Sequence, residues 1–454
     1  MQYQIMADNI EINAKNVQEW VQIFKNNILP ERERLASYYD GKNCIVKQGA
    51  VAGRPNYSIN VNMAKYIIDV ATGYAFGNPI KYSTDDNKAD DILEKIQYVH
   101  KNCNISELDF QQGGDMATFG IAYHLVMVLG DKGAIEDRIS LKHLSPLQTF
   151  IVTDNTILET PLCGIYFYSY KENNTDKTKI YVYDNINLTI FVDVGGVLTV
   201  ESINPHNMGA IPIIQCLNND DAFSDIQCIT DLLDGLSLAV SNNTDNLQSI
   251  ANAILAASGG VLDDEAIQML NDTKVANLPE GAKMEWIIKN VDPTAEQQQI
   301  DNLLNFIFQI SQVPDLTDKA FGGNQSGVAM QYKLWGLDQL WVTKTTKYKK
   351  AIVQRLKILM HLLQYEIKSN VQMLDEIDIT FDKNLPKDNS AEYTMVQALK
   401  DVVSKRTLLA NVSIVKDVEA ELKALEEEAE KNADLYGFNN NINLNGGANA
   451  EEQE

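Results

Sequence analysis

The chain has 454 residues, of which 45% are hydrophobic and 22% charged, and this composition excludes a disordered or fibrous protein. Acidic residues outnumber basic ones by 62 to 38, so the formal net charge is −24. That balance excludes a protein that grips nucleic acid over its whole surface, because such binding needs Lys and Arg to displace the counterions of the phosphates. An acidic chain can still meet DNA if its task is to let DNA slide. At about 100–200 residues per domain, the length predicts two to four domains.

The cysteine pattern indicates neither a zinc site nor a disulfide framework. No two cysteines form a CxxC pair, and we expect five free thiols in a reducing cytosol. The N-terminal stretch MQYQIMADNIEINAKN lacks a basic run followed by an apolar run, so no signal peptide is expected. The most apolar stretch, residues 120–130, has about half the length that spans a bilayer, and no membrane partner is expected. The cysteines are Cys44, Cys103, Cys163, Cys216 and Cys228.

The first 120 residues are predicted to be mostly helical. In residues 14–40, apolar side chains recur at steps of three and four. Residues 54–83 carry a second helix that ends near Gly73 and Gly77, with Pro79 beyond its end. A third helical stretch covers about residues 87–120.

From residue 121 to 215 the hydrophobic period changes to that of strands. Polar turns such as DKG, ENNTDK and VGG separate short apolar runs, which predicts a patch of short antiparallel strands. The candidate strands are 123–129, 148–152, 162–170, 178–183, 187–193 and 197–203.

Two helical rods are predicted after the strand-rich region. Residues 225–257 hold apolar residues at alternating steps of three and four, which suits a long rod packed against neighbours. Residues 258–293 then form a small unit with seven acidic residues against three lysines. The second rod runs to about residue 312 and begins after Asp292, an N-cap residue, with Pro293 at the first helical position.

A loop, PDLTDKAFGGNQ, follows the second rod at residues 314–325. Ser326 can cap the next helix, which measures roughly 66 Å at ~1.5 Å per residue if it continues to residue 369. Gly336 is a candidate bend in that helix. Beyond it, residues 376–386 alternate like a strand, and residues 388–435 are helical and acidic. The Asn- and Gly-rich end is expected to be disordered.

Residue patterns that carry catalysis are scarce. The five histidines are scattered, with no HExxH or HxH pair. The stretch FGGNQSG at 321–327 lacks the Lys that follows the second Gly of a phosphate-binding loop, and no GxGxxG follows a strand. Adjacent acidic pairs fit solvated turns, since a metal would need a third ligand nearby. We therefore expect no catalytic residue, no metal and no cofactor.

One stretch of the long helix breaks the acidic trend. In one interpretation, its basic residues form a solvated face or pair with acidic helices. In the other, they contact DNA or an acidic neighbour. The former is favoured, because the stripe between these residues is apolar and must be packed. For Trp335 and Trp341, core packing is favoured over base stacking. The basic residues are Lys344, Lys347, Lys349, Lys350, Arg355 and Lys357.

The run SGVAMQYKLWGLDQL at 326–340, preceded by PDLTDKAFGGN, resembles the signature of the portal proteins of tailed bacteriophages, in the siphovirus-type branch from phages of Gram-positive hosts. YYDGKN at 38–43, NMAKYIIDVATGYAFGNPIKYS at 62–83 and the passage 211–246 resemble further parts of that family. The match spans about residues 35–385 in the same order.

The resemblance implies an α+β, mainly α fold with long stem helices, a β-rich wing, a small clip and a helical crown. Transferred to this sequence, the wing comprises residues 1–225, the first stem helix 226–257, the clip 258–293, the second stem helix 294–313, the tunnel loop 314–325, the long wing helix with its returning strand 326–387, the crown 388–436 and a disordered tail 437–454.

The resemblance also implies a function without catalysis. Portal proteins form a ring, dodecameric in the virion, at one capsid vertex, and DNA is packaged and ejected through its channel. The implied partners are further copies of the chain, double-stranded DNA in transit, the large terminase subunit, a head-completion adaptor, and the major capsid and scaffolding proteins. The expected location is the virion, after assembly in the host cytoplasm.

Site residues follow from the same resemblance. Ser326 is expected to cap the helix after the loop, and Asp263, Asp264 and Glu265 to face partners from the clip. Lys319 is the candidate for a transient phosphate contact, with a salt bridge to a neighbouring loop as an equal alternative. The residues expected to face DNA are Asp315, Leu316, Thr317, Asp318, Lys319, Phe321, Gly322, Gly323 and Asn324.

Two other classes of protein compete with a channel. An enzyme of the packaging machine, a nuclease or an ATPase, is disfavoured by the missing phosphate-binding loop and the missing carboxylate cluster. A scaffold or adaptor built on helical rods, without ring assembly, is the third class.

Overall fold

The computed structural model describes residues 4–7, 11–43, 56–84, 90–251, 254–258, 281, 283–287, 293–317, 327–363, 377–385, 389–400 and 402–410, with a few residues between 412 and 428. Residues 1–384 form one compact unit and residues 385–454 a second. Within the second unit, the described helices are α13 (Asn389–Leu399) and α14 (Lys405–Ala410). All further elements belong to the first unit.

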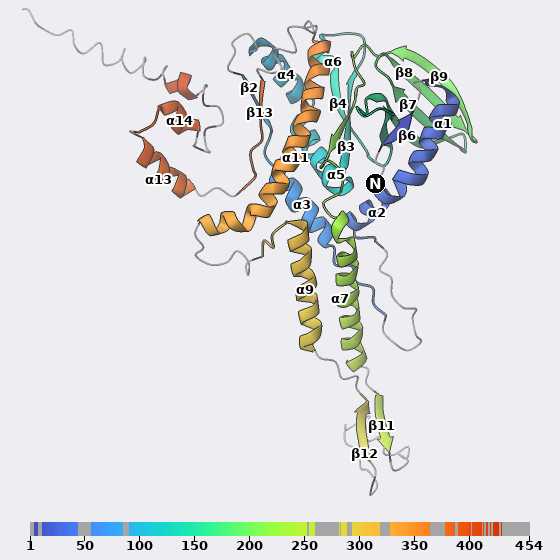
Figure 1. Ribbon diagram of the computed structural model, residues 1–454, viewed down its shortest axis with the longest axis vertical. Coiled ribbons are helices and arrows are strands. Elements are labelled where there is room, and N and C mark those ends of the chain that lie inside the picture. The colour runs from blue at the N-terminus through green and yellow to red at the C-terminus, as the bar shows by residue number, and fades with distance from the viewer. Residues whose placement is uncertain are drawn as a thin grey trace, which may run out of the picture. The chain divides into compact units, whose positions relative to one another are not determined.

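A six-stranded sheet combines β1, near the N-terminus, with the five strands β5 to β9 from the middle of the sequence (Figure 1). Its strands run antiparallel from β5 to β9, whereas β1 joins the edge parallel to β5. One face is buried by α1 and the π-helical turn that follows it, and the ring of Phe24 stacks on Phe150 at 4.8 Å between centroids. In spatial order the strands are β1 (Ile5–Ala7), β5 (Thr149–Asp154), β6 (Pro161–Glu172), β7 (Thr175–Tyr183), β8 (Asn187–Val194) and β9 (Val197–Pro205).

A second, three-stranded sheet has the order β10–β3–β4, with β10 (Ile213–Leu217), β3 (Ile121–Val128) and β4 (Ile139–Leu144). The long helix α11 (Gly327–Leu362) packs beside β10, and the shared core includes Ile214, Cys216 and Tyr348. Figure 1 shows α11 changing direction within its N-terminal part. Segments that lie far apart in the sequence, from Ala75 to Ile379, therefore share one core.

Two further sheets each consist of two strands. β2 (Lys81–Thr84) pairs antiparallel with β13 (Ile377–Thr380), which returns the chain to its N-terminal part as expected. β11 (Ile254–Ser258) pairs antiparallel with β12 (Lys283–Ile287), inside the segment expected to form the clip.

Most of the helices cover these sheets or extend the chain away from them. Helices α7 and α9 lie side by side, and Asn246 Nδ2 donates to Glu296 Oε1 across the pair at 2.6 Å (Figure 1). Apolar side chains of both helices join α3 and α11 in a second core, which includes Leu233, Leu236 and Ile307. The bounds are α1 (Ala14–Ile23), η1 (Phe24–Ile28), α2 (Leu29–Tyr39), α3 (Met63–Phe76), α4 (Asp90–Asn102), α5 (Ile105–Phe119), α6 (Ile135–Arg138), η2 (Gln227–Ile229), α7 (Thr230–Ala251) and α9 (Pro293–Ser311).

Several expectations need correction. The rod predicted over 225–257 is α-helical at 230–251, after the 3-10 turn η2, whereas residues 254–258 form a strand. A short apolar run fits either period, and pairing with β12 decides between them. The helical stretch 87–120 is two helices, separated where Asn104 adopts φ 51°. The strands expected within residues 121–215 do pair antiparallel, but the sequence pattern missed β1, which joins them parallel to β5, and it missed β2, β4 and β10 as strands.

Candidate functional site

The loop that follows α9 is anchored at its start by one tyrosine of α3. The phenolic hydroxyl of Tyr66 donates to the carbonyl of Pro314 at 3.1 Å and accepts from the amide of Leu316 at 2.9 Å. Its ring packs edge-on against Phe308, with 6.0 Å between centroids. Burial raises the pKa of Tyr66, so the hydroxyl keeps the proton that it donates. Helix α3 thus fixes the point from which the loop departs.

The same turn is pressed against α11 through a glycine. Gln312 adopts φ 59°, the left-handed conformation that ends α9. A Cβ atom added at Gly336 of α11 would lie 3.1 Å from the carbonyl oxygen of Gln312 and 3.2 Å from its Cβ. Gly336, predicted as a candidate bend, therefore permits a close approach of α11 to the end of α9.

A hydrogen bond within the loop also fixes the conformation of its first residues. The amide of Thr317 donates to Asp315 Oδ1 at 3.0 Å, an Asx turn. Leu316 and Thr317 are exposed, whereas Asp315 is half-buried. These three are the loop residues, among those predicted to face DNA, that the structure describes. The remaining predicted positions, namely Asp318, Lys319, Phe321, Gly322, Gly323, Asn324, the cap Ser326 and the clip residues Asp263, Asp264 and Glu265, lie outside the described residues.

The paired helices α7 and α9 carry acidic charge and no compensating base. Their sequences contain three aspartates in α7 and Glu296 and Asp301 in α9, with neither Lys nor Arg. Asp234 of α7 is held in place, because it accepts hydrogen bonds from the Tyr38 hydroxyl at 2.8 Å and from Asn43 Nδ2 at 2.9 Å. A phosphate chain passing these helices would meet no cation on them.

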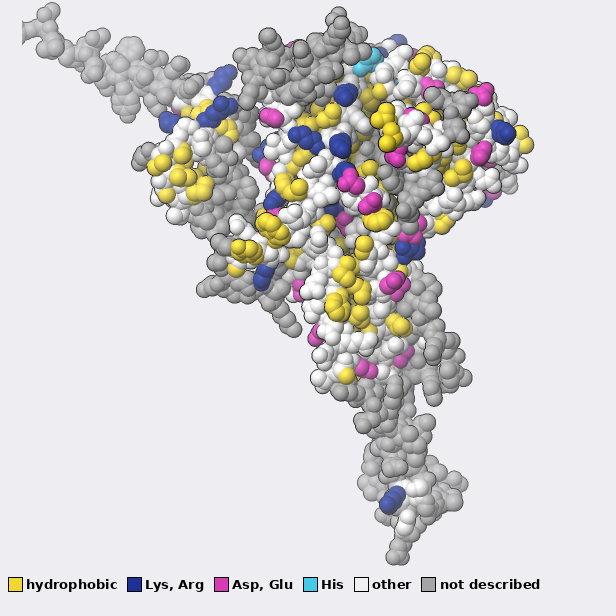
Figure 2. All heavy atoms as spheres, viewed as in Figure 1, with side chains coloured by type: hydrophobic (Ala, Val, Ile, Leu, Met, Phe, Trp, Pro, Cys, Tyr) yellow, Lys and Arg dark blue, Asp and Glu magenta, His cyan; other side chains and the backbone are white. Residues whose placement is uncertain are grey.

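One face of this helix pair exposes apolar side chains (Figure 2). Leu247 is 62% exposed, Phe306 51% and Ile310 50%. Along one stripe of α9, the apolar Ala295, Leu303 and Phe306 line a shallow groove together with the polar Gln298, Gln299 and Asn302. Apolar stripes of this kind on adjacent helices are suited to pack against another helix.

A family comparison identifies the chain. Residues 21–435 match the family described as phage portal protein, SPP1 Gp6-like. The chain belongs to this family. The portal protein of Bacillus phage SPP1 is 22% identical to it over 398 residues, which cover 82% of this chain and 76% of the relative. A solved structure described as the neck of an empty GTA particle computed with C6 symmetry matches 77% of this chain and 88% of its own, at 14% identity and a TM-score of 0.44.

Membership of the portal family fixes the general role. Portal proteins are structural virion proteins rather than enzymes, form homo-oligomeric rings and provide the channel for DNA. The mixed helical and sheet architecture agrees with the predicted α+β, mainly α fold. None of the described helices of this portal protein is both long and apolar enough to cross a bilayer. Over the same described residues, no cluster of three His, Cys, Asp or Glu side chains could hold a metal, and Cys103, Cys163, Cys216 and Cys228 are free thiols.

Half of the basic cluster in α11 of the portal protein forms internal ion pairs. Lys344 is buried with its Nζ 2.6 Å from the carboxylate of Asp225, and Lys347 pairs with the exposed Asp220. Arg355, fully buried, contacts Asp109 at 2.8 Å. The favoured interpretation of pairing with acidic helices is confirmed for Arg355, whose partner Asp109 lies in α5. Lys344 and Lys347 pair instead with the segment between β10 and η2, and Lys349, Lys350 and Lys357 are exposed, as in a solvated face.

The buried arginine organises a polar network that sequence reasoning missed. Asp109 Oδ1 accepts from the Tyr348 hydroxyl at 2.6 Å as well as from Arg355, and Arg355 Nη2 contacts the Tyr82 hydroxyl at 2.9 Å. Burial raises the pKa of Tyr82 to about 12, so this hydroxyl stays neutral. The signal in the sequence was an Arg within an apolar helical stripe, which needs a buried carboxylate as partner.

The two tryptophans differ in environment. Trp341 is half-buried between the two helical cores, with the Lys383 ammonium 4.9 Å from its ring centroid, as core packing predicts. Trp335 is 63% exposed, so the expectation of core packing was wrong for this residue. A spacing of six residues places the two rings on different sides of the helix, and only one of those sides is covered by the described part of the chain.

Proposed function

We propose that this portal protein assembles into a ring, a dodecamer in the virion, at one capsid vertex, and that double-stranded DNA is packaged and ejected through its centre. The observation that carries the proposal is the pair α7 and α9, which bears acidic residues and neither Lys nor Arg. Duplex DNA carries about one negative charge per 1.7 Å, and a ring repeats each lining residue in every subunit. A lining without cations would let DNA slide, whereas a basic one would hold it.

The regions of the chain then take these roles. Residues 1–225 with 326–387 form the wing, α7 and α9 the stem, residues 258–293 the clip, 314–325 the tunnel loop, 388–436 the crown, and 437–454 a disordered tail. The exposed apolar stripe with Phe306 and Ile310 supports contact between neighbouring stem helices. The clip and wing would dock the large terminase subunit, the head-completion adaptor, and the capsid and scaffolding proteins.

The tunnel loop would make transient contacts with DNA that passes through the channel. The hydrogen bonds of Tyr66 hold the first residues of the loop in place, which supports a loop whose attachment point is fixed. Asp315, Leu316, Thr317 and the loop residues after them would face DNA, with Lys319 making brief phosphate contacts and Ser326 capping the helix that anchors the loop. We infer no catalysis, and ATP hydrolysis by the purified protein alone would contradict that inference.

Electron microscopy of the purified protein tests the assembly: rings with a central hole are expected, and a stable monomer that never assembles would contradict the proposal.

The stem assignment is tested by Asp301→Lys, which adds one exposed cation to α9 in every subunit. Retention of linear duplex DNA by the rings should rise and become more salt-dependent. Asp176→Lys, an equal charge change on the exposed end of β7, should leave retention unchanged.

A further inference from the structure

The strand β10 has an open edge. Register pairs Ile213 with Leu125 of β3, and the amide of Val126 donates to the carbonyl of Pro212 at 3.0 Å. At the other end, the amide of Asn218 donates to the carbonyl of Gly120 at 2.9 Å. Because hydrogen-bonded pairs alternate in an antiparallel ladder, the intervening bonded residues of β10 are 214 and 216.

The main-chain groups of Ile213, Gln215 and Leu217 therefore point away from β3. The sheet order ends at β10, and across the described residues these three amides and carbonyls have no hydrogen-bond partner. A strand edge with unpaired N–H and C=O groups is a template for one more strand. What lies along that edge decides whether another strand can reach it.

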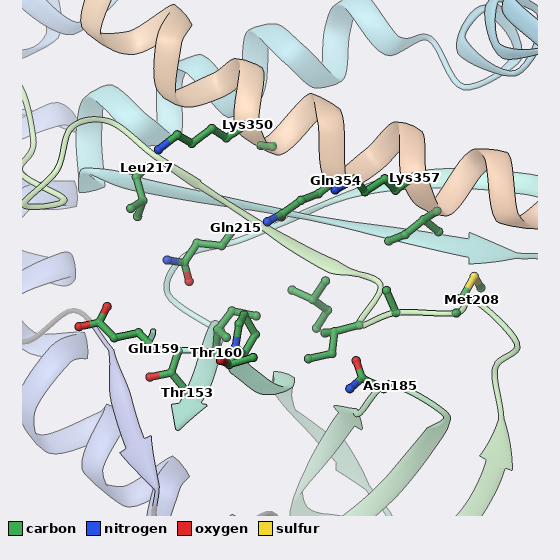
Figure 3. A pocket seen from close by; sticks show the side chains of 18 of the residues that line it. Thr153, Glu159, Thr160, Asn185, Met208, Gln215, Leu217, Lys350, Gln354 and Lys357 are labelled. Atoms are coloured by element: carbon green, nitrogen blue, oxygen red, sulfur yellow. The ribbon is translucent and has the colours of Figure 1, made fainter. Parts of the chain in front are cut away.

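A groove runs along this edge, and we call it the β10 groove. It is lined by Ile213, Gln215 and Leu217, by α11 on one side and by the β5–β6 turn on the other, and it encloses about 690 Å³. Figure 3 shows Lys350, Gln354 and Lys357 on the α11 side, and Thr153, Glu159 and Thr160 opposite, with Gln215 and Leu217 between them. Volumes of about 300–1,000 Å³ are typical of sites that hold a ligand.

The two walls of the β10 groove differ in charge. Lys350 and Lys357 are exposed, lie about two helical turns apart on one stripe of α11, and form no ion pair within the described part of the chain. Lys347 of the same stripe is already paired with Asp220. On the opposite wall, Glu159 is the one acidic residue of the groove lining, among apolar and neutral side chains such as Ile151 and Pro161.

We propose that the β10 groove binds an extended segment of a partner protein whose residues alternate between acidic and apolar. The segment adds a strand to β10 and hydrogen-bonds to the main chain of Ile213, Gln215 and Leu217. Side chains of an added strand alternate between its two faces, so acidic residues meet Lys350 and Lys357 while apolar residues face the β5–β6 wall. The recognition is independent of the DNA channel and does not rest on it.

The probe for this site is a fluorescent, end-blocked heptapeptide of alternating glutamate and valine, titrated with the purified full-length protein and followed by anisotropy. Saturable binding is expected, and Lys350→Glu with Lys357→Glu should weaken it at least tenfold. Lys349→Glu is the matched control, because Lys349 is exposed on the same helix but does not line the groove. Equal loss in the control would overturn the proposal.

Backbone N-methylation separates strand addition from simple charge attraction. Two peptides carry N-methyl groups on the odd or on the even residues, so that only one of them blocks the amides facing β10. One should lose binding at least tenfold and the other should retain it. Peptide binding should also slow amide hydrogen exchange in residues 213–217. The proposal would be overturned by equal binding of both methylated peptides or by unchanged hydrogen exchange. It would also be overturned if a synthetic peptide of the protein's own C-terminal residues 437–454 displaced the probe.

Discussion

At the scale of single residues, close packing makes neighbouring positions differ sharply in the space that they leave for a side chain. Gly113 and Gly114 are adjacent in α5, yet a Cβ atom at Gly113 would lie 2.2 Å from Phe76 Cδ2, while one at Gly114 would meet nothing within 4 Å. The ring of Phe76 is itself held edge-on against Tyr348, at 5.1 Å between centroids. The space beside Gly113 is therefore part of the core that α3, α5 and α11 share.

We expect Gly113→Ala to destabilise the protein by about 1–3 kcal/mol, because Phe76 must move within a packed core. Gly114→Ala should be neutral or stabilising by up to about 1 kcal/mol, since Ala is the better helix former. Thermal unfolding of the two variants measures the difference. Equal melting temperatures would contradict the packing around Phe76.

Two buried histidines make stability depend on pH. Burial, and then the charge of Arg355, hold the pKa of His100 well below its usual range, and burial does the same for the pKa of His124. As pH falls below about 6.5, the unfolded chain binds a proton at each ring while the folded one does not. The free energy of unfolding should therefore fall with pH below about 6.5.

His100→Phe tests this linkage. Nε2 of His100 has no hydrogen-bond partner among the residues that the structure describes, so the substitution removes the titratable ring without breaking a hydrogen bond of that atom. The drop in melting temperature between pH 7 and pH 5 should be smaller in His100→Phe than in the wild type. His361→Gln, at an exposed position, should keep the wild-type dependence, and an unchanged drop in His100→Phe would refute the assignment.

At the scale of elements, α11 is held to the rest of the chain by buried charge as well as by apolar contacts. Lys344 Nζ donates to Asn218 Oδ1 at 2.6 Å and lies 2.6 Å from the Asp225 carboxylate, which ties the helix to the segment that follows β10. About three turns further on, Arg355 ties it to Asp109 of α5. Loss of one partner leaves a buried charge unpaired, which costs more than the pair contributes.

Lys344→Met should therefore destabilise the protein by about 3–5 kcal/mol. Chemical denaturation measures the effect, and Lys349→Met, which removes an exposed lysine of the same helix, should change stability by about 0.5 kcal/mol or less. Asp225→Asn combined with Lys344→Met should recover part of the loss, because no buried charge remains. A double variant as unstable as Lys344→Met would argue against an electrostatic origin.

At the scale of the whole molecule, the exposed apolar side chains of α7 and α9 form the surface that ring assembly is expected to bury. Phe306→Asp with Ile310→Asp should disrupt rings without unfolding the subunit, because both side chains are about half exposed in the single chain. Size-exclusion chromatography with light scattering measures the assembly, and circular dichroism the fold. Asn305→Asp, at an exposed polar position beside them, should still form rings. Intact rings in the double variant would place the subunit contact elsewhere.

The role proposed for residues 314–325 as a tunnel loop would show only in the assembled particle. Gly322→Val with Gly323→Val should leave rings intact but impair DNA packaging, since β-branched residues lack the φ freedom that a mobile loop needs. Packaging into purified empty capsids with the terminase motor measures the effect. Normal packaging by the variant would argue against a mobile loop at these residues.

The local sequence predicted those features whose signals are local. The periods of α3, α9 and α11 and the strand run from β5 to β9 follow from spacing within single segments. The order of degenerate motifs along the chain was enough to indicate the portal family, which the family comparison confirmed. The loop and clip residues expected to meet DNA and partners stay predictions.

Only the tertiary structure decided how distant segments pair. The strand at 254–258 exists because residues 283–287 pair with it, and β2 exists because β13 returns to it across almost three hundred residues. The open edge of β10 and the pairing of Lys344 with Asp225 are likewise properties of segments far apart in sequence. A helical period is set by neighbours three and four residues away, whereas strand pairing, edges and buried ion pairs are set by contacts that no local pattern specifies.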